Sequence, residues 1–271
     1  MNAVIALSPM DLSIAALLVV ALAFLSFRMD LGVTRQIVVA ALRTTLQLLL
    51  VGMVLKTLFD RAQPWMLAFI ALVMVTTAGR VVMSRQTRQF TGIWGFGTGT
   101  AAMTVSSFSI TCLVLTTVIR IDPWYAPQYA IPLLGMMLGN TMTGIAIGME
   151  RLTSTAWRDS GVIEGRLMLG QTWDEAIGTI RRESIRSAMI PTLNSMAVAG
   201  IVSLPGMMTG QILAGSPPME AVKYQILIMF IISSGTGFGA VLAVSVGARR
   251  LFDERQRLRL DRLVGKKNEA R

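Results

Sequence analysis

The stretch LSIAALLVVALAFLSF, residues 12–27, contains no charged side chain. At a rise of about 1.5 Å per residue, a helix of this length approaches the ~30 Å thickness of the hydrocarbon core of a membrane. The chain has 271 residues, of which 53% are hydrophobic and only 15% charged, which is too apolar for a soluble protein of this size. Similar, predominantly apolar runs occupy residues 36–58, 64–83, 95–119, 129–149, 189–204 with a continuation to about 215, and 222–247. The sequence therefore predicts an all-α polytopic membrane protein, a single transmembrane domain over residues 1–271 with about seven transmembrane helices.

The basic residues gather in every second connection between these runs. Five basic residues do not follow this pattern: Arg43 lies within a run, and Lys56, Arg61, Arg120 and Lys223 lie at the opposite ends of the runs. Because cytoplasmic loops of membrane proteins carry an excess of Lys and Arg, this pattern predicts an outside N-terminus and a cytoplasmic C-terminus. Residues 248–271 then form a basic cytoplasmic tail. The net charge of +10 is explained by this asymmetry, so we expect the lipid bilayer and not nucleic acid as its partner.

The longest predicted cytoplasmic segment is the loop at residues 150–188, between the fifth and sixth runs. Thr172 and Glu175 have the spacing of a capping box, which predicts a helix that begins at about Trp173. Gly170 suits the left-handed end of a short preceding helix. Two interpretations remain open. The loop is either an amphipathic connector on the membrane surface or a docking element that transmits the movement of an ATP-driven partner to the membrane helices.

The sequence EGRLMLGQTWDEA, residues 164–176, resembles the EAA-type loop of ABC-transporter permeases. Glu164 matches the leading acid of that loop, and Gly170 matches the glycine six positions later. The sequence departs from the pattern at Gly165 and Arg166, where the family usually has two alanines. The resemblance implies that this cytoplasmic coupling loop docks an ATP-hydrolysing subunit through Glu164, Leu167, Gly170, Thr172, Trp173 and Glu175.

Three further stretches are similar to the FetB-type family of small ABC permeases. They are IPLLGMMLGN at 131–140, RESIRSAMIPTLNSMAVAGIVSLPGMMTGQILAG at 182–215, and AVKYQILIMF at 221–230. This resemblance implies a homodimeric, multi-pass permease in the bacterial inner (plasma) membrane, paired with a separate ATP-binding subunit. The family includes bacterial iron exporters, and its plant relatives are connected with aluminium tolerance and nucleotide-sugar export.

The chain itself lacks the sequence of a P-loop ATPase. Such a loop needs G-x-x-x-x-G-K-[ST], whose backbone amides and lysine hold the phosphates and whose hydroxyl holds magnesium. The only Gly-Lys pair is Gly265-Lys266, which is followed by Lys267 and has no glycine at the required upstream position. We therefore expect that this chain is not an enzyme and binds no cofactor, and that ATP and Mg are held by the partner subunit.

Polar groups within the predicted spans are candidates for a transport pathway, because such groups are costly in a membrane. Arg43 and Gln47 share one face of the second span, where they either line a vestibule or serve as headgroup and interhelical contacts. Asn140 and Asn194 either line a pathway or hydrogen-bond between helices. Pro205-Gly206 interrupts the sixth run and predicts a broken helix, which is either a gate or a simple kink.

Two similar motifs, GMMLGN at 135–140 and GMMTGQ at 206–211, each contain a methionine pair. Thioethers suit either soft metals or irregular packing. The chain has no His, and its single cysteine, Cys112, excludes an intrachain disulfide. The predicted topology puts both motifs in the outer half of the membrane, so we expect an outer gate or a weak metal path lined by Met136, Met137, Met207 and Met208.

Together, the predicted topology, the loop and the family resemblance indicate the permease subunit of an ABC exporter, with iron or a related metal as the substrate. Two other functions remain open. One is the export of an organic anion such as a nucleotide sugar, which Arg43 would favour if it faces a cavity. The other is a membrane anchor or assembly subunit that has no pathway and recruits a soluble enzyme.

Overall fold

The computed structural model describes residues 8–61 and 63–265 and is almost entirely helical. Within these residues, six helices are long and apolar enough to cross a membrane, which confirms an all-α polytopic membrane protein. The helices are α1 (Pro9–Arg28), α2 (Thr34–Arg61), α3 (Pro64–Ser84), α4 (Ile93–Leu113) with a π-helical continuation (Val114–Ile119), α5 (Pro127–Arg158), α6 (Ser160–Met168), α7 (Trp173–Val198), α8 (Gly206–Leu213), α9 (Pro218–Arg250) and a 3-10 turn (Leu260–Arg262). Two short strands, β1 (Arg88–Phe90) and β2 (Leu263–Gly265), pair antiparallel.

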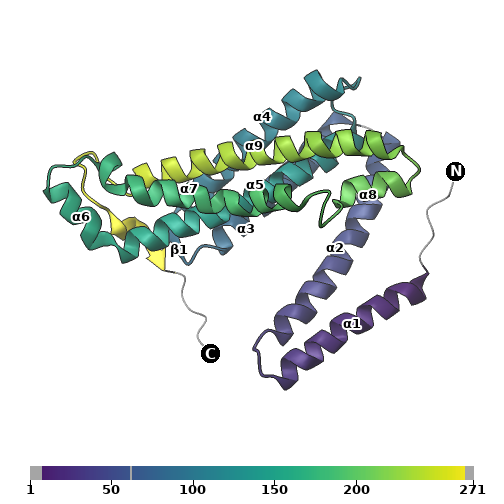
Figure 1. Ribbon diagram of the computed structural model, residues 1–271, viewed down its shortest axis with the longest axis horizontal. Helices are drawn as coiled ribbons and strands as arrows, with labels where there is room; N and C mark the ends of the chain where they lie inside the picture. Colours follow the sequence, from purple (N-terminus) through teal and green to yellow (C-terminus); the bar gives the residue numbers. More distant parts are fainter. Residues whose placement is uncertain (1–7, 62, 266–271) are drawn as a thin grey trace.

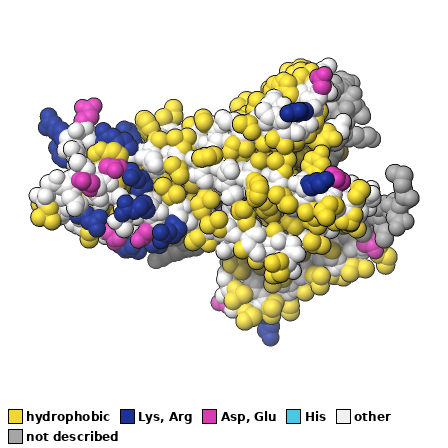
Figure 2. Space-filling model, turned by 45° about the horizontal axis from the view of Figure 1, so that its top comes forward, with side chains coloured by type: hydrophobic (Ala, Val, Ile, Leu, Met, Phe, Trp, Pro, Cys, Tyr) yellow, Lys and Arg dark blue, Asp and Glu magenta, His cyan; other side chains and the backbone are white. Residues whose placement is uncertain are grey.

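Helices α3, α4, α5, α7 and α9 pack side by side as an elongated bundle, while α1 and α2 form a hairpin, most of which stands away from the bundle (Figure 1). The membrane-length part of α2 has no buried residue. The bundle contains the main core cluster, which includes Ile145, Met149 and Val244. Away from the end where charged side chains gather, the face shown in Figure 2 is mostly apolar, as expected of a surface in contact with lipid.

Glycines allow the central helices to approach closely. Gly144 of α5 faces Thr236 of α9, and a Cβ built at Gly144 would lie 2.5 Å from Thr236 Cγ2 and 3.1 Å from the Ala188 carbonyl oxygen of α7. Gly239 of α9 packs in the same way against Thr141 of α5. Contacts between small residues of this kind are the usual means by which membrane helices associate, because lipid offers no hydrophobic driving force between them.

The predicted sixth span differs from the structure in where it begins and where it is interrupted. Helix α7 begins in the loop at Trp173, passes through Pro191 and ends at Val198. Residues 199–205 are not helical, with Gly200 at φ +81°, and α8 begins at Gly206. The break expected at Pro205-Gly206 is therefore the last part of a longer interruption. Because the first half of α7 is charged, α7 is not one of the six helices that are long and apolar enough to cross a membrane. The seventh span therefore remains a prediction.

Charged side chains gather at one end of the molecule, which contains α6, the start of α7 and the two strands (Figures 1 and 2). This is the end that the positive-inside pattern assigns to the cytoplasm. We refer to it below as the charged end.

Candidate functional site

The predicted coupling loop folds as two helices joined by a tight turn at the charged end. Thr172 is the N-cap of α7, and its side chain and that of Glu175 form the expected capping box. Hydrogen bonds donated by the Thr172 amide and hydroxyl lower the pKa of the Glu175 carboxyl. Gly170 has φ +86°, the left-handed conformation expected after α6. These local predictions from the sequence are confirmed, while the coupling role of the residues remains a prediction.

The tip of this element carries two strongly exposed apolar side chains, Met168 and Leu169, at 82% and 85% exposure. By contrast, Leu167 and Trp173 pack against the main core cluster and hold the element in place. Glu164 is exposed beside the tip. An apolar pair on a charged surface is typical of a contact with another protein. The local sequence pattern does not mark these two residues, because the exposure of a side chain depends on how the helices pack.

The C-terminal segment, residues 251–265, packs against the start of α7 and does not extend away as a simple basic tail. Gln256 Oε1 accepts a hydrogen bond of 2.9 Å from the backbone amide of Trp173. The Trp173 ring also lies 5.9 Å from the ring of Phe252, and the Arg249 guanidinium lies 5.0 Å over it. A groove of about 760 Å³ separates residues 254–258 from the tip of the coupling loop. The remaining residues of the predicted tail, 266–271, lie outside the described part of the chain.

The connection between α3 and α4 is tied to α5 at the same end. Glu150 accepts hydrogen bonds from the amide and hydroxyl of Thr87, at 2.6 and 2.7 Å, and from the hydroxyl of Ser154, at 2.7 Å. The hydroxyl of Thr153 donates to the Arg88 carbonyl at 3.0 Å, and the Arg88 guanidinium stacks 3.6 Å from the ring centroid of Trp157. Because Arg88 lies in β1, which pairs with β2, this connection is linked to the C-terminal segment and through it to α7.

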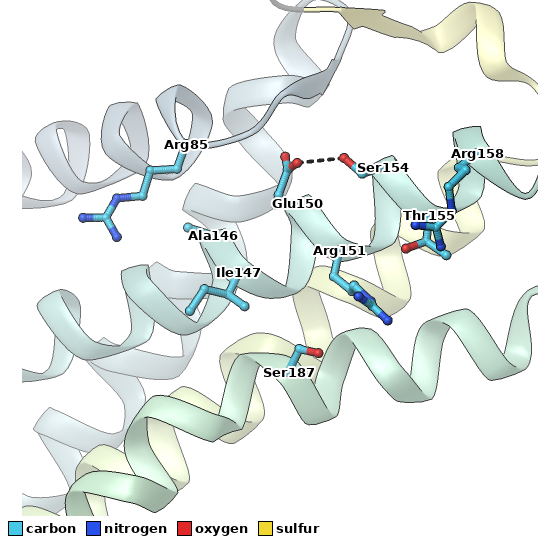
Figure 3. Close-up of a pocket in the computed structure, with 9 residues that line it drawn as sticks. All are labelled: Arg85, Ala146, Ile147, Glu150, Arg151, Ser154, Thr155, Arg158 and Ser187. Atoms are coloured by element: carbon cyan, nitrogen blue, oxygen red, sulfur yellow. Dashed lines mark hydrogen bonds between the residues drawn. The ribbon is translucent and has the colours of Figure 1, made fainter. Parts of the chain in front are cut away.

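Beside Glu150, an open groove of about 660 Å³ lies along the second half of α5, between the end of α3 and the middle of α7. Its lining is rich in arginine and hydroxyl groups, and the side chains of Ala146 and Ile147 lie at the same end as Arg85 (Figure 3). The lining residues are Arg85, Ala146, Ile147, Glu150, Arg151, Ser154, Thr155, Arg158 and Ser187. No motif in the sequence marks this groove, because three separate helices supply its walls.

The candidate pathway residues do not converge on one site within the described chain. Arg43 and Gln47 are exposed on α2, which lies apart from the bundle (Figure 1). Asn140 is exposed, and its amide donates to the Met136 carbonyl of its own helix. Asn194 is exposed on α7. Pro205 is the N-cap of α8 and Gly206 is its first residue.

The methionine pairs also have different environments. Met137 is fully buried in a second core cluster, where it packs on Gly235 of α9, and Met136 packs against the same cluster. Met207 is exposed and Met208 is half-buried on α8, which packs against α9. Within the described residues, no group of three or more His, Cys, Asp or Glu side chains is placed to hold a metal ion. The outer gate remains a prediction.

A family model described as the uncharacterised protein family UPF0014 matches residues 9–252. The UPF0014 membrane protein slr1647 of Synechocystis is 39% identical over 243 residues, which cover 89% of this chain and 92% of that protein. The probable iron export permease protein FetB of Escherichia coli is 31% identical over 256 residues, with 94% and 96% covered. The UPF0014 membrane protein STAR2 of rice is 32% identical over 231 residues, with 85% and 79% covered. No solved structure matches the chain.

Proposed function

The chain belongs to the UPF0014 family of membrane proteins, and from this premise we propose that it is the membrane-spanning permease subunit of an ABC exporter. A separate P-loop ATPase docks on residues 160–186 and binds the ATP and Mg. The proposed substrate is iron or a related metal, because the relative from Escherichia coli is named a probable iron export permease. The proposed location is the inner membrane of a bacterium.

The observation that carries this proposal is the exposed tip of the coupling loop. Met168 and Leu169 form the exposed apolar tip at the charged end, and the turn at Gly170 with the N-cap Thr172 fixes its conformation. An apolar tip surrounded by charged side chains fits an apolar pocket with a polar rim on a soluble partner.

Helix α7 supplies the mechanical link from this tip to the membrane. It is one helix of 26 residues from Trp173 to Val198, and it packs on both α5 and α9. A displacement of the tip would therefore move α7 as a unit, because a hydrogen-bonded helix is much stiffer than a loop. The interruption at residues 199–205 then provides the place where this movement can open or close a path.

The same interruption supports the proposed homodimer. Gly144 is 17 residues along α5 from Pro127, about 26 Å at ~1.5 Å per residue, so with the start of α5 at the outer surface it lies near the inner edge of a hydrocarbon core of ~30 Å. Gly144 faces Ala188 of α7, and Val198 is ten residues further along α7, about 15 Å back towards the outer surface. The non-helical residues 199–205 therefore begin near the middle of the membrane. Ile201 and Val202 are 88% and 79% exposed there in the single chain. Irregular backbone at this depth is stable only where protein or a water-filled cavity covers it, and a second copy would provide that cover.

Co-expression with a candidate P-loop ATPase, in inverted membrane vesicles, tests the function. We expect ATP-dependent uptake of Fe²⁺ and co-purification of the ATPase, both lost in Leu169→Asp. Ile93→Asp is the matched control, because Ile93 is an equally exposed apolar residue at the start of α4, beside β1 at the charged end, and lies outside residues 160–186. Uptake of Fe²⁺ that depends neither on ATP nor on Leu169 would contradict the proposal that the chain is an ABC permease. Uptake of another substrate without uptake of Fe²⁺ would contradict the proposed metal substrate.

A further inference from the structure

Two threonines inside the bundle carry hydroxyl groups that the protein leaves unpaired. Thr141 of α5 and Thr236 of α9 are fully buried, and the Oγ1 atom of each has no hydrogen-bond partner in the described part of the chain. Thr236 lies 13 residues from both Lys223 and Arg249, the nearest charged residues on α9, which is about 20 Å from each at ~1.5 Å per residue. Thr236 is therefore near the middle of the membrane-crossing part of α9.

The two threonines lie at one crossing of α5 and α9. Thr236 faces Gly144 of α5, where a built Cβ would lie 2.5 Å from its methyl carbon. Thr141 faces Gly239 of α9, where the corresponding distance is 2.7 Å. Ser106 of α4 reaches the same point, because its Oγ lies 2.8 Å from the Cβ built at Gly239. Three helices therefore bring hydroxyl-bearing side chains to one place, and each threonine packs on a glycine of the opposite helix.

Unpaired hydroxyls of this kind are costly. A hydroxyl inside a helix commonly donates to the carbonyl four residues earlier, as Thr143 does to Gly139 at 3.0 Å. Thr143 is only two residues from Thr141 and points to the opposite side of α5, since two residues turn a helix by about 200°. A buried hydroxyl without a partner has lost its bonds to water and gained none in return. Polar groups in this state within a membrane indicate a place that water or an ion enters.

Helix α7, which starts at the coupling loop, touches this crossing directly. The carbonyl oxygen of Ala188 lies 3.1 Å from a Cβ built at Gly144, and Met189 Sδ lies 3.5 Å from one built at Gly237 of α9. A displacement of α7 would therefore act on both α5 and α9 at the level of the two threonines. Because a glycine faces each threonine, a small separation of the two helices would uncover both hydroxyls together.

We propose that α4, α5 and α9 separate at this crossing during transport and that the hydroxyls of Ser106, Thr141 and Thr236 then bind a hydrated divalent cation. Hydroxyl oxygens accept hydrogen bonds from the water molecules that such a cation retains, and hard cations prefer oxygen ligands. In the closed arrangement the glycines let the helices meet, so the hydroxyls have no partner. The nature of the cation rests on the proposed function. The passage itself lies inside one subunit and not between two copies.

Uptake of Fe²⁺ by inverted vesicles that contain the chain and its ATPase tests the site. Thr141→Val and Thr236→Val keep the shape of the side chain and remove the hydroxyl, and each should lower uptake roughly tenfold. Their melting temperatures in detergent should stay unchanged or rise, because the lost hydroxyl had no partner. Thr141→Ser keeps the hydroxyl and should retain most of the uptake. Thr143→Val is the matched control and should transport as the wild-type protein does.

Labelling of introduced cysteines separates this proposal from the transport function. Cys112 is the single cysteine of the chain, so Thr141→Cys, Thr236→Cys and Thr143→Cys each carry one thiol in a Cys112→Ser background. A water-soluble thiosulfonate, added with ATP to the membranes of the producing cells, should label the thiols at positions 141 and 236 and not the thiol at 143.

Each outcome bears on the passage. If wild-type vesicles take up no Fe²⁺ but the labelling is as expected, the proposed substrate is wrong and the passage is supported. Absence of label at both 141 and 236, or equal labelling at all three positions, would overturn the proposal. Equal uptake by Thr141→Val, Thr236→Val and Thr143→Val would also overturn it.

Discussion

Replacing Gly144 with alanine tests whether close packing of α5 against α7 and α9 stabilises the bundle. The added Cβ would lie 2.5 Å from Thr236 Cγ2 and 3.1 Å from the Ala188 carbonyl oxygen. The carbonyl belongs to the backbone of α7 and cannot turn aside as the end of a long side chain can. Overpacking of this kind costs about 1–3 kcal/mol, and the better helix propensity of alanine offsets at most about 1 kcal/mol. We expect the free energy of unfolding to fall by up to about 2 kcal/mol.

Thermal unfolding of the purified protein in detergent, followed by tryptophan fluorescence, measures this effect. At roughly 2–4 °C per kcal/mol for a chain of this size, the melting temperature of Gly144→Ala should fall by up to about 8 °C. Gly139→Ala is the matched control on the same helix, because a Cβ there meets no atom within 4 Å. Its melting temperature should stay unchanged or rise.

The double variant Gly144→Ala/Thr236→Ala distinguishes a steric clash from other effects of the substitution. It removes the methyl group that the new Cβ meets, and Thr236 Oγ1 has no hydrogen-bond partner among the described residues whose loss would obscure the result. The double variant should therefore recover part of the lost stability. If Gly144→Ala has the same melting temperature as Gly139→Ala, or if adding Thr236→Ala recovers none of the lost stability, the close contact does not stabilise the bundle.

Three other predictions concern the charged end. Glu150→Gln should lower stability by about 1–3 kcal/mol and speed hydrogen exchange at residues 85–92, because it weakens the three hydrogen bonds from Thr87 and Ser154; Glu254→Gln, at an exposed position, should change neither, and equal exchange in both variants would contradict the role of Glu150. Gln256→Ala removes the hydrogen-bond acceptor for the Trp173 amide and should loosen the start of α7. The tryptophan fluorescence of this variant should then shift to the red relative to Arg255→Gln, and an unchanged spectrum would count against this contact. Arg259 lowers the pKa of the Asp261 carboxyl to about 2, below the unfolded value of about 3.9, so its stabilising contribution is present above about pH 4 and is lost as the pH falls towards 2. Exchange of the β2 amides, corrected for the intrinsic rate, should then rise between pH 5 and pH 2 in the wild-type protein, whereas Asp261→Asn should respond less; identical pH responses would refute the ion pair as the cause.

The features that the sequence predicted correctly are those that depend on neighbouring residues or on the thickness of the membrane. Six of the seven predicted apolar runs became long helices, because a helix satisfies its own backbone groups in lipid. The capping box of Thr172 and Glu175 formed because its partners are three residues apart. Gly170 took the left-handed conformation for an equally local reason.

The prediction for the sixth span was incomplete because a helix end depends on more than its proline. Pro191 was tolerated inside α7, while the helix ended at Val198, well before Pro205. Helix α7 packs against both α5 and α9 along its length, which favours a continuous helix. Beyond Val198, the positive φ of Gly200 and a turn closed on the Val198 carbonyl interrupt it.

The sequence by itself determined that this chain is a helical membrane protein, which end of it carries the charge, and that a capped helical turn lies at that end. These properties follow from hydrophobic length, charge placement and contacts within one turn of helix. Only the tertiary structure decided that Gln256 supports Trp173, that Glu150 holds the connection after α3, and that Arg85 and Arg151 share one groove. These partners are separated by 63 or more residues in the chain, so no local pattern records them, and they meet only when the helices pack.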